Sequence, residues 1–425
     1  MTHLSDKFHY ACNDCGAEYT SAKVMYLCPA CQPENKPDKP PKGVLKTLYN
    51  YAEIRKLAPS ARLYEYLQNE KFLSLLPLAD LKNWPKLRVG NTPLYNFDRF
   101  DSEKLDFELY LKDDSQNPTF SFKDRASALV SAWARENNIN TIIAASTGNA
   151  GSSLAGICAS QGQQSIIFVP ATAPLAKLTQ IMMYGAKIVP VDGTYDQAFD
   201  LSVKASEMFG FYNRNTAYNP LTIEGKKTVS FELFGDLNRQ IPDRIFIPVG
   251  DGAIISGVYK GFEDLLKLGI IERMPIIVAV QAAGSSNLTR NINHDRFEAS
   301  VSDTIADSIS VDIPRNFYMT ANFLKQYGGE WITVSDAEIL KSSVKLSRST
   351  GIFAEPAAAA AIAGMLKYKE LGMLPVGSKN VVLLTGNGLK DLKSVQTCIK
   401  LPEPVKPEIA SLEKIFLNKS LKSLI

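Results

Sequence analysis

The chain has 425 residues, of which 45% are hydrophobic and 21% charged, values that predict a globular protein with room for two domains. Its net charge is +3, from 47 basic and 44 acidic side chains, and this balance argues against a nucleic-acid or membrane partner. No apolar run reaches the roughly 18 residues of a membrane span and no signal peptide is evident, so we expect a cytoplasmic protein without disulfides.

Two CxxC pairs, separated by twelve residues, stand near the start of the chain. Their cysteines are Cys12, Cys15, Cys28 and Cys31. Zinc takes four thiolates at the corners of a tetrahedron, and two knuckles at this spacing supply them. We therefore predict a structural zinc ribbon within residues 1–43, which end in a proline-rich linker from Pro33 to Gly43.

The hydrophobic pattern from Val44 to about Leu87 is mainly helical, so residues 44–95 are expected to form a helical extension. Beyond it, short β-branched runs alternate with longer amphipathic ones. The expected strands are Phe107–Lys112, Thr141–Ala145, Ser165–Val169, Lys187–Val191, Arg244–Val249, Ile276–Val280 and Val381–Leu384. The expected helices include Gly151–Ser160, Tyr195–Phe209, Glu224–Leu237 and Gly257–Leu266.

This alternation predicts an α/β fold in which helices cover two parallel sheets. Residues 96–400 are expected to form a core of two α/β subdomains, the smaller at about 130–235. The remaining residues, 401–425, contain three prolines and then an amphipathic pattern around Leu412, Phe416 and Leu424. We expect a tail helix there that packs on the body or on the partner subunit of a homodimer.

The first segment whose residues could take part in catalysis is N-P-T-F-S-F-K-D-R. It carries Lys123 at the point where an extended stretch changes to a helical pattern. The positive end of a helix lowers the pKa of a lysine, and a partly neutral amine is what Schiff-base formation requires. A solvated helix lysine is the alternative. The chain has only three histidines, none of them in the segments described here, so a lysine is the obvious proton carrier.

A second segment, at residues 146–151, follows an expected strand and reads S-T-G-N-A-G. Free backbone N–H groups at such a helix start can bind a carboxylate, and Asn149 can bond to a phenolic oxygen of a cofactor. A plain N-cap turn is the alternative.

A third segment, G-D-G-A-I at residues 250–254, allows close approach of the backbone to a phosphate. A dinucleotide site is disfavoured, because Ile255 replaces the third glycine of GxGxxG and no acidic residue ends the next strand. In the fourth segment, T-G-N-G-L-K-D, the Thr385 hydroxyl can bond to a pyridine nitrogen without fully protonating it.

The four segments, in this order, resemble fold-type-II enzymes that use pyridoxal phosphate (PLP), and specifically the threonine synthase family. The resemblance covers roughly residues 90–395, including G-I-F-A-E-P-A at residues 351–357. It implies that Lys123 forms a Schiff base with PLP, that Asn149 meets the ring oxygen and that Thr385 meets the ring nitrogen. The implied holders of the PLP phosphate are Gly250, Asp251, Gly252, Ala253 and Ile254. The implied binders of the substrate carboxylate are Ser146, Thr147 and Gly148.

Two features depart from the threonine synthase pattern. Thr222 stands in N-P-L-T-I-E-G-K-K-T where many members have an arginine for the substrate phosphate. Lys226, Lys227 and Arg315 are the substitutes that the sequence offers. The sequence of residues 304–311 resembles the corresponding stretch of serine/threonine dehydratases more than that of threonine synthases.

The leading function is the conversion of O-phosphohomoserine and water to threonine and phosphate. Two alternatives are β-replacement on O-phosphoserine with sulfite, as in cysteate synthase, and a dehydratase-like ammonia-lyase reaction. A zinc-dependent regulator that retains an inactive PLP fold is a third, and the intact Lys123 segment argues against it. In each enzymatic reaction, freed Lys123 removes the α-proton and PLP stores the resulting charge.

Overall fold

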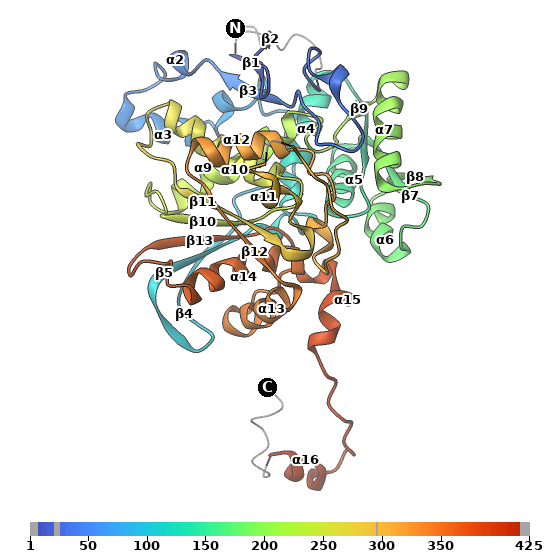
Figure 1. Cartoon of the computed structure of the whole chain (residues 1–425), viewed down its shortest axis with the longest axis vertical. Helices are drawn as coiled ribbons and strands as arrows, with labels where there is room; N and C mark the ends of the chain where they lie inside the picture. Colours follow the sequence, from blue (N-terminus) through green and yellow to red (C-terminus); the bar gives the residue numbers. More distant parts are fainter. Residues whose placement is uncertain (1–6, 21–25, 295, 417–425) are drawn as a thin grey trace.

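The described residues of the computed structural model are 7–20, 26–294 and 296–416. They form two parallel-containing sheets with helices packed around them, and a small antiparallel sheet near the N-terminus (Figure 1). The α/β architecture agrees with the prediction. No helix within these ranges is long and apolar enough to cross a lipid bilayer.

The larger sheet has six strands in the order β12-β11-β10-β13-β5-β4. Their bounds are β4 Leu94–Phe100, β5 Glu103–Asp113, β10 Arg244–Pro248, β11 Ile276–Ala282, β12 Glu330–Val334 and β13 Lys379–Leu384. Neighbouring strands are parallel except for β4, which runs antiparallel to β5. The four inner strands were predicted and the two edge strands, β4 and β12, were not, because polar residues interrupt the apolar residues of both.

The smaller sheet has four parallel strands in the order β8-β7-β6-β9. Their bounds are β6 Thr141–Ala145, β7 Gln164–Pro170, β8 Lys187–Val191 and β9 Tyr212–Asn213. The helices α5 (Asn149–Gln161) and α7 (Tyr195–Phe209) pack against it, and α6 (Leu175–Met183) follows α5 and β7. At two residues, β9 is too short to leave a hydrophobic pattern in the sequence.

The other long helices of the core include α4 (Lys123–Glu136), α10 (Ala253–Lys267), α12 (Phe317–Gln326), α13 (Asp336–Thr350) and α14 (Pro356–Glu370). The shorter helices are α2 (Tyr51–Ile54), α3 (Ser60–Asn69), α11 (Asn287–Asn291) and α15 (Leu392–Val395). Instead of one helix over Glu224–Leu237, the chain forms α8 (Leu221–Lys226) and α9 (Thr228–Asp236), which meet at Lys227.

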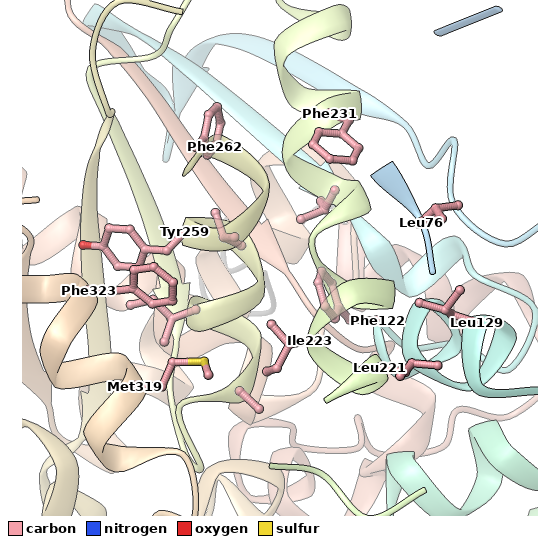
Figure 2. Packing of buried hydrophobic residues seen from close by; sticks show 14 of the residues in the cluster. Leu76, Phe122, Leu129, Leu221, Ile223, Phe231, Tyr259, Phe262, Met319 and Phe323 are labelled. Carbon is pink, nitrogen blue, oxygen red and sulfur yellow. The ribbon is translucent and has the colours of Figure 1, made fainter. Parts of the chain in front are cut away.

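Helix α8 packs tightly between α4 and α10. A Cβ added at Gly225 would collide with the backbone of Arg125 on α4, and one at Gly257 would lie 2.5 Å from the Cβ of Lys226. Glycine at both positions therefore permits the close approach. Figure 2 shows the buried side chains that α8, α9, α10 and α12 contribute to this core, among them Ile223, Phe231 and Tyr259.

The small antiparallel sheet has the order β2-β1-β3, with β1 at Phe8–Cys12, β2 at Glu18–Thr20 and β3 at Leu45–Tyr49. The prediction of helix from Val44 onward is wrong for β3, whose alternate residues are buried as it pairs with β1. The expected linker also folds back, since the Cys28 amide donates to the Gly43 carbonyl at 2.8 Å. Residues 33–43 thus close the ribbon and return the chain to its sheet.

Helix α16 (Ile409–Phe416) lies away from the body at the end of an extended segment (Figure 1). Ile409 and Phe416 are exposed, so the described tail does not pack on the body of its own chain. Packing on a partner subunit remains a prediction. Leu424 lies outside the described residues.

Candidate active site

A cavity of about 400 Å³ lies where strands of both parallel sheets end. Ala145 at the end of β6, Pro248 at the end of β10 and Thr385 just after β13 all reach it. Ligands of α/β proteins bind at the carboxyl ends of strands, because loops and helix N-termini converge there. The cavity lining includes every residue that the sequence assigned to PLP or to the substrate carboxylate: Lys123, Ser146, Thr147, Gly148, Asn149, Gly250, Asp251, Gly252, Ala253, Ile254 and Thr385.

Lys123 is the first residue of α4, as its sequence context predicted. The backbone joins its segment to the Thr385 loop, since the Phe122 amide donates to the Thr385 carbonyl at 2.9 Å and the Asn387 amide donates to the Phe120 carbonyl at 3.1 Å. These bonds bring Lys123 and Thr385 into one cavity. Thr385 is 7% exposed, and no described residue forms a hydrogen bond with its hydroxyl.

The Lys123 amine has an unusual charge environment. Burial lowers the pKa of Lys123 to about 8, and the nearby Arg214 guanidinium acts in the same direction. The carboxyl groups of Asp251 and Glu355 oppose this shift and do not cancel it. A lysine with this pKa is partly neutral near physiological pH, as a nucleophilic amine must be.

The Ser146–Asn149 turn connects β6 to the start of α5. Gly151 makes this turn possible, because a Cβ there would lie 2.6 Å from the Ser146 carbonyl oxygen. No side chain caps the N-terminus of α5, which leaves its first N–H groups at the cavity for an anion.

The segment from Gly250 to Ile254 connects β10 to α10. A Cβ at Gly250 would lie 2.8 Å from the Cα of Ile309, and Gly252 has a φ of +85°, a conformation that favours glycine. The Asp251 carboxylate accepts a bond from the Arg315 amide at 2.9 Å. No side chain caps the start of α10, so its first N–H groups form a cradle suited to a phosphate.

Glu355 is a site residue that the sequence analysis did not single out. It immediately precedes α14, lines the cavity and accepts hydrogen bonds from the Asn149 amide at 2.9 and 3.0 Å. Burial raises the pKa of Glu355, while the Asn149 bond and the positive Lys390 and Lys123 oppose that shift. The signal in the sequence was an acidic residue inside the otherwise apolar G-I-F-A-E-P-A segment.

Arg214 is a second site residue that the sequence analysis missed. It directly follows β9, lines the cavity and is fully buried. Its guanidinium donates to Ser127 Oγ at 3.2 Å, Thr216 Oγ1 at 3.0 Å and the Lys123 carbonyl at 3.5 Å. Its short strand gives no periodic signal, so its position beside β6 could not be read from the sequence.

Of the three cations that the sequence offered as binders of the substrate phosphate, only Arg315 lines the cavity. Lys227 is buried between Glu224 and Asp264, at 2.5 and 2.7 Å, so it is already neutralised and does not line the cavity. Lys226 donates to the Thr222 carbonyl at 3.2 Å and is also absent from the lining. Arg315 does line the cavity, where its guanidinium pairs with Asp196 and covers the Phe199 ring.

The four cysteines of the ribbon converge as predicted, and their sulfur atoms all lie within 4.8 Å of one another. The Cys12 and Cys31 sulfurs are 3.8 Å apart, and those of Cys15 and Cys28 are 3.7 Å apart. Zinc–sulfur bonds of about 2.3 Å in a tetrahedron place sulfurs about 3.8 Å apart. The cluster therefore has the size of a tetrahedral zinc site.

Known proteins resemble this chain over most of its length. Residues 86–386 match the family described as "Pyridoxal-phosphate dependent enzyme". The threonine synthase of Methanocaldococcus jannaschii is 33% identical over 95% of this chain and 98% of its own length. That of Methanosarcina acetivorans is 32% identical, over 97% of this chain and 100% of its own length.

Solved structures resemble the fold as well. The processed form of threonine deaminase isoform 2 from Solanum lycopersicum has a TM-score of 0.64 and 21% identity, over 89% of this chain and 98% of that chain. The serine racemase of maize has a TM-score of 0.60 and 21% identity, over 73% of this chain and 92% of that chain. At these identities, the likeness identifies the fold alone.

Proposed function

Because the chain belongs to the pyridoxal-phosphate dependent enzymes and, within them, to the threonine synthase family, we propose that it converts O-phosphohomoserine and water to threonine and phosphate. The observation that carries this proposal is the match to threonine synthases over 95% of the chain. A cavity that gathers an amine of lowered pKa and two anion-binding helix starts supports it.

The residues of the cavity fit PLP. The Gly250–Ile254 cradle suits its phosphate, the Lys123 amine suits its aldehyde, and the unbonded Thr385 hydroxyl suits its ring nitrogen. When bound, PLP stores the negative charge that develops on the substrate when its α-proton leaves. A hydroxyl partner, unlike a carboxylate, leaves the ring nitrogen largely unprotonated, which favours elimination and replacement over transamination.

The remaining roles fall to groups of the chain itself. Ser146, Thr147 and Gly148 hold the substrate carboxylate at the start of α5. Lys123 Nζ accepts the α-proton once the substrate amine has displaced it, and the same nitrogen returns a proton later in the reaction. A Cβ proton also leaves, so that the Cγ–O bond can break with its electron pair going to the departing phosphate. Cγ then takes up a proton to become the methyl group, water adds its oxygen at Cβ, and a proton returns to Cα.

Asn149 meets the ring oxygen of PLP in this assignment. Glu355 acts as a positioning residue, because both of its oxygens accept from the Asn149 amide and fix the direction of that side chain. Outside the cavity, Cys12, Cys15, Cys28 and Cys31 hold one structural zinc ion, which the tetrahedral spacing of their sulfurs supports. The proposed reaction also suits the cytoplasmic location expected from the sequence.

The test is a phosphate-release assay on the holoenzyme with O-phosphohomoserine, in parallel with O-phosphoserine with and without sulfite. We expect the specificity constant for O-phosphohomoserine to be the higher by at least about a hundredfold, a difference of roughly 3 kcal/mol in transition-state binding. No turnover of O-phosphohomoserine, with sulfite-dependent turnover of O-phosphoserine, would replace the proposal with a cysteate-forming reaction. The Thr222 substitution is the feature that would favour that outcome.

A further inference from the structure

Arg214 is a buried cation of the cavity whose protein partners are all neutral. Its three hydrogen bonds go to two hydroxyls and a backbone carbonyl, and no carboxylate of the described residues forms an ion pair with it. Burying an unpaired guanidinium costs free energy, so native proteins retain one where an anion binds. Three weak acceptors also leave part of its five-donor fork unused.

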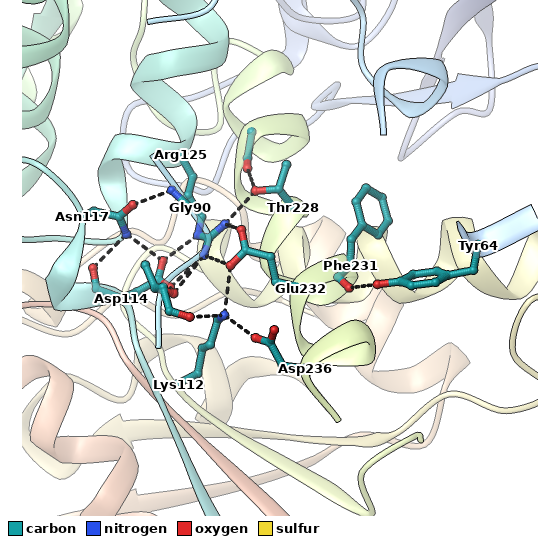
Figure 3. A network of polar contacts seen from close by, with 12 residues as sticks. Tyr64, Gly90, Lys112, Asp114, Asn117, Arg125, Thr228, Phe231, Glu232 and Asp236 are labelled. Carbon is teal, nitrogen blue, oxygen red and sulfur yellow. Dashed lines mark hydrogen bonds and ion pairs between the residues drawn. The ribbon is translucent and has the colours of Figure 1, made fainter. Parts of the chain in front are cut away.

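Arg125 shows what a structural buried arginine looks like in the same chain. Its guanidinium pairs with Asp114 and Glu232, each at 2.6 Å, and also donates to Thr228 (Figure 3). Arg125 is therefore neutralised inside the protein, whereas Arg214 faces the cavity with no carboxylate of the described residues in ion-pair contact, and the nearby Asp124 only partly opposes the fall in its pKa. Burial lowers the pKa of Arg214 to about 10, which still leaves it charged at neutral pH.

The position of Arg214 indicates which anion it meets. Its amide donates to the Ile143 carbonyl at 2.8 Å, which places it beside β6, the strand that leads into the Ser146–Asn149 turn. The cradle that suits the cofactor phosphate follows β10 of the other sheet. Arg214 thus stands on the same side of the cavity as the groups assigned to the substrate.

We propose that Arg214 binds the side-chain phosphate of the substrate, a role that Thr222 cannot fill. Thr222 is fully buried, and its hydroxyl donates to the Asn219 carbonyl at 2.8 Å, so it does not reach the cavity. The inference rests on the proposed function in that it takes the substrate to be a phosphorylated amino acid. A guanidinium presents parallel N–H donors to a phosphate and leaves it poised as a stabilised leaving group.

The test compares two ligands that differ only in the anionic group, 2-amino-5-phosphonopentanoate and norvaline (2-aminopentanoate). Their binding to the holoenzyme is followed through the absorbance of the bound cofactor. We expect Arg214→Gln to weaken binding of the phosphonate by about ten- to a hundredfold and binding of norvaline by less than about threefold. Arg214→Lys should recover part of the lost phosphonate affinity, because lysine restores the positive charge but not the parallel N–H donors of a guanidinium.

A matched control is Arg99→Gln, because Arg99 is exposed on the β4–β5 hairpin, and it should leave both affinities unchanged. Equal weakening of both ligands, or of neither, would overturn the assignment. A loss of PLP affinity of more than about tenfold in Arg214→Gln would assign the residue to the cofactor phosphate and would also overturn it. Failure of both Arg214 variants to fold would make the residue structural, with the same consequence.

If O-phosphohomoserine is not the substrate, the role of Arg214 is tested with a shorter pair of ligands. If the wild-type enzyme turns over O-phosphoserine and not O-phosphohomoserine, the ligand pair becomes 2-amino-4-phosphonobutanoate and 2-aminobutanoate. Arg214→Gln should then weaken binding of the shorter phosphonate selectively. Selective loss of phosphonate binding would keep Arg214 as the phosphate binder although the reaction on O-phosphohomoserine is abandoned. Without selective loss, the Arg214 assignment and the proposed reaction would both be overturned.

Discussion

The charges around Lys123 decide how readily its amine gives up a proton. Burial and Arg214 favour the neutral amine, while Asp251 and Glu355 favour the charged one, and the balance holds the pKa of Lys123 at about 8. An ordinary lysine near pH 7 is neutral in fewer than about one molecule in a thousand. At a pKa of about 8, roughly a tenth of the molecules carry the nucleophilic amine at that pH.

The first prediction concerns the rate at which apoenzyme recaptures PLP. Only the neutral Lys123 amine attacks the aldehyde, so the rate should rise with pH through a midpoint at about 8. Arg214→Gln removes a positive neighbour that disfavours the charged amine, so the midpoint should move to higher pH. Stopped-flow absorbance from about pH 6 to about pH 10 measures both profiles, and the titration of PLP itself is common to both proteins. A midpoint that moves downward would contradict the assigned effect of Arg214.

The candidate site was predictable where its residues belong to ordered motifs. Lys123 and Thr385 line one cavity, as their segments implied, because backbone bonds join those segments. Arg214 could not be identified, since its importance lies in having no acidic partner, a property of the folded structure. Lys227 was a wrong choice because Asp264, 37 residues away in sequence, neutralises it in the core.

Secondary-structure elements were predictable to the extent that their hydrophobic pattern is continuous. Strands β6 and β8 have the predicted bounds, as buried or half-buried parallel strands with compact apolar runs should. Strand β3 alternates, and its five residues L-K-T-L-Y were absorbed into a longer helical interpretation. The break between α8 and α9 at Lys227 lies two residues after Gly225, a glycine that the single-helix interpretation over Glu224–Leu237 did not treat as a helix end.

The second prediction concerns the polar network that fixes the start of α4 (Figure 3). Arg125→Ala would leave the buried Asp114 carboxylate without its cation and Glu232 with Lys112 alone, so the free energy of unfolding should fall by about 3–5 kcal/mol. Urea denaturation measures the loss. In the exposed pair of Arg273 with Asp243, Arg273→Ala should cost less than about 1 kcal/mol. Equal losses in the two variants would show that the network adds no more than a surface contact.

The third prediction concerns the ribbon. Elemental analysis of the wild-type protein should find one zinc per chain, and Cys12→Ser should lower both the zinc content and the melting temperature. The activity per folded molecule should change by less than about threefold, because the cysteines lie outside the cavity lining. Cys398→Ser is the control, since Cys398 is exposed and lies outside the cluster. A wild-type protein without zinc would refute the metal assignment.

At the scale of the whole molecule, the ribbon and its following segment are fastened to the helices beneath the active site. The Lys46 amine pairs with Glu263 on α10 at 2.7 Å, the Tyr49 hydroxyl donates to Glu224 on α8, and the Tyr51 hydroxyl donates to Asp264 on α10 at 2.6 Å. Together with Lys227 and Lys260, these groups form a buried ionic cluster. Residues 46–51 thus give Glu263 a cation and give Glu224 and Asp264 a hydroxyl donor each, so we infer that this segment stabilises the catalytic core.

The tail carries apolar surface that the other described residues of the chain do not cover. Ile409 is 72% and Phe416 is 61% exposed on α16, which stands clear of the body (Figure 1). An amphipathic helix of eight residues is not stable alone in water, so packing against another surface must supply its stability. The sequence analysis anticipated either the body of the chain or a partner subunit, and the described tail does not pack on the body.

The fourth prediction is therefore that Ile409→Ser combined with Phe416→Ser weakens self-association. The double variant removes two exposed apolar side chains of α16, and the dimer dissociation constant should rise by at least about tenfold. Sedimentation velocity over a dilution series measures the constant, while circular dichroism checks that the body remains folded. Lys406→Gln, an exposed polar change in the same tail, should leave the association unchanged. A wild-type protein that stays monomeric throughout the series would contradict the prediction. A dimer equally tight in the double variant would show that surfaces other than α16 hold the subunits together.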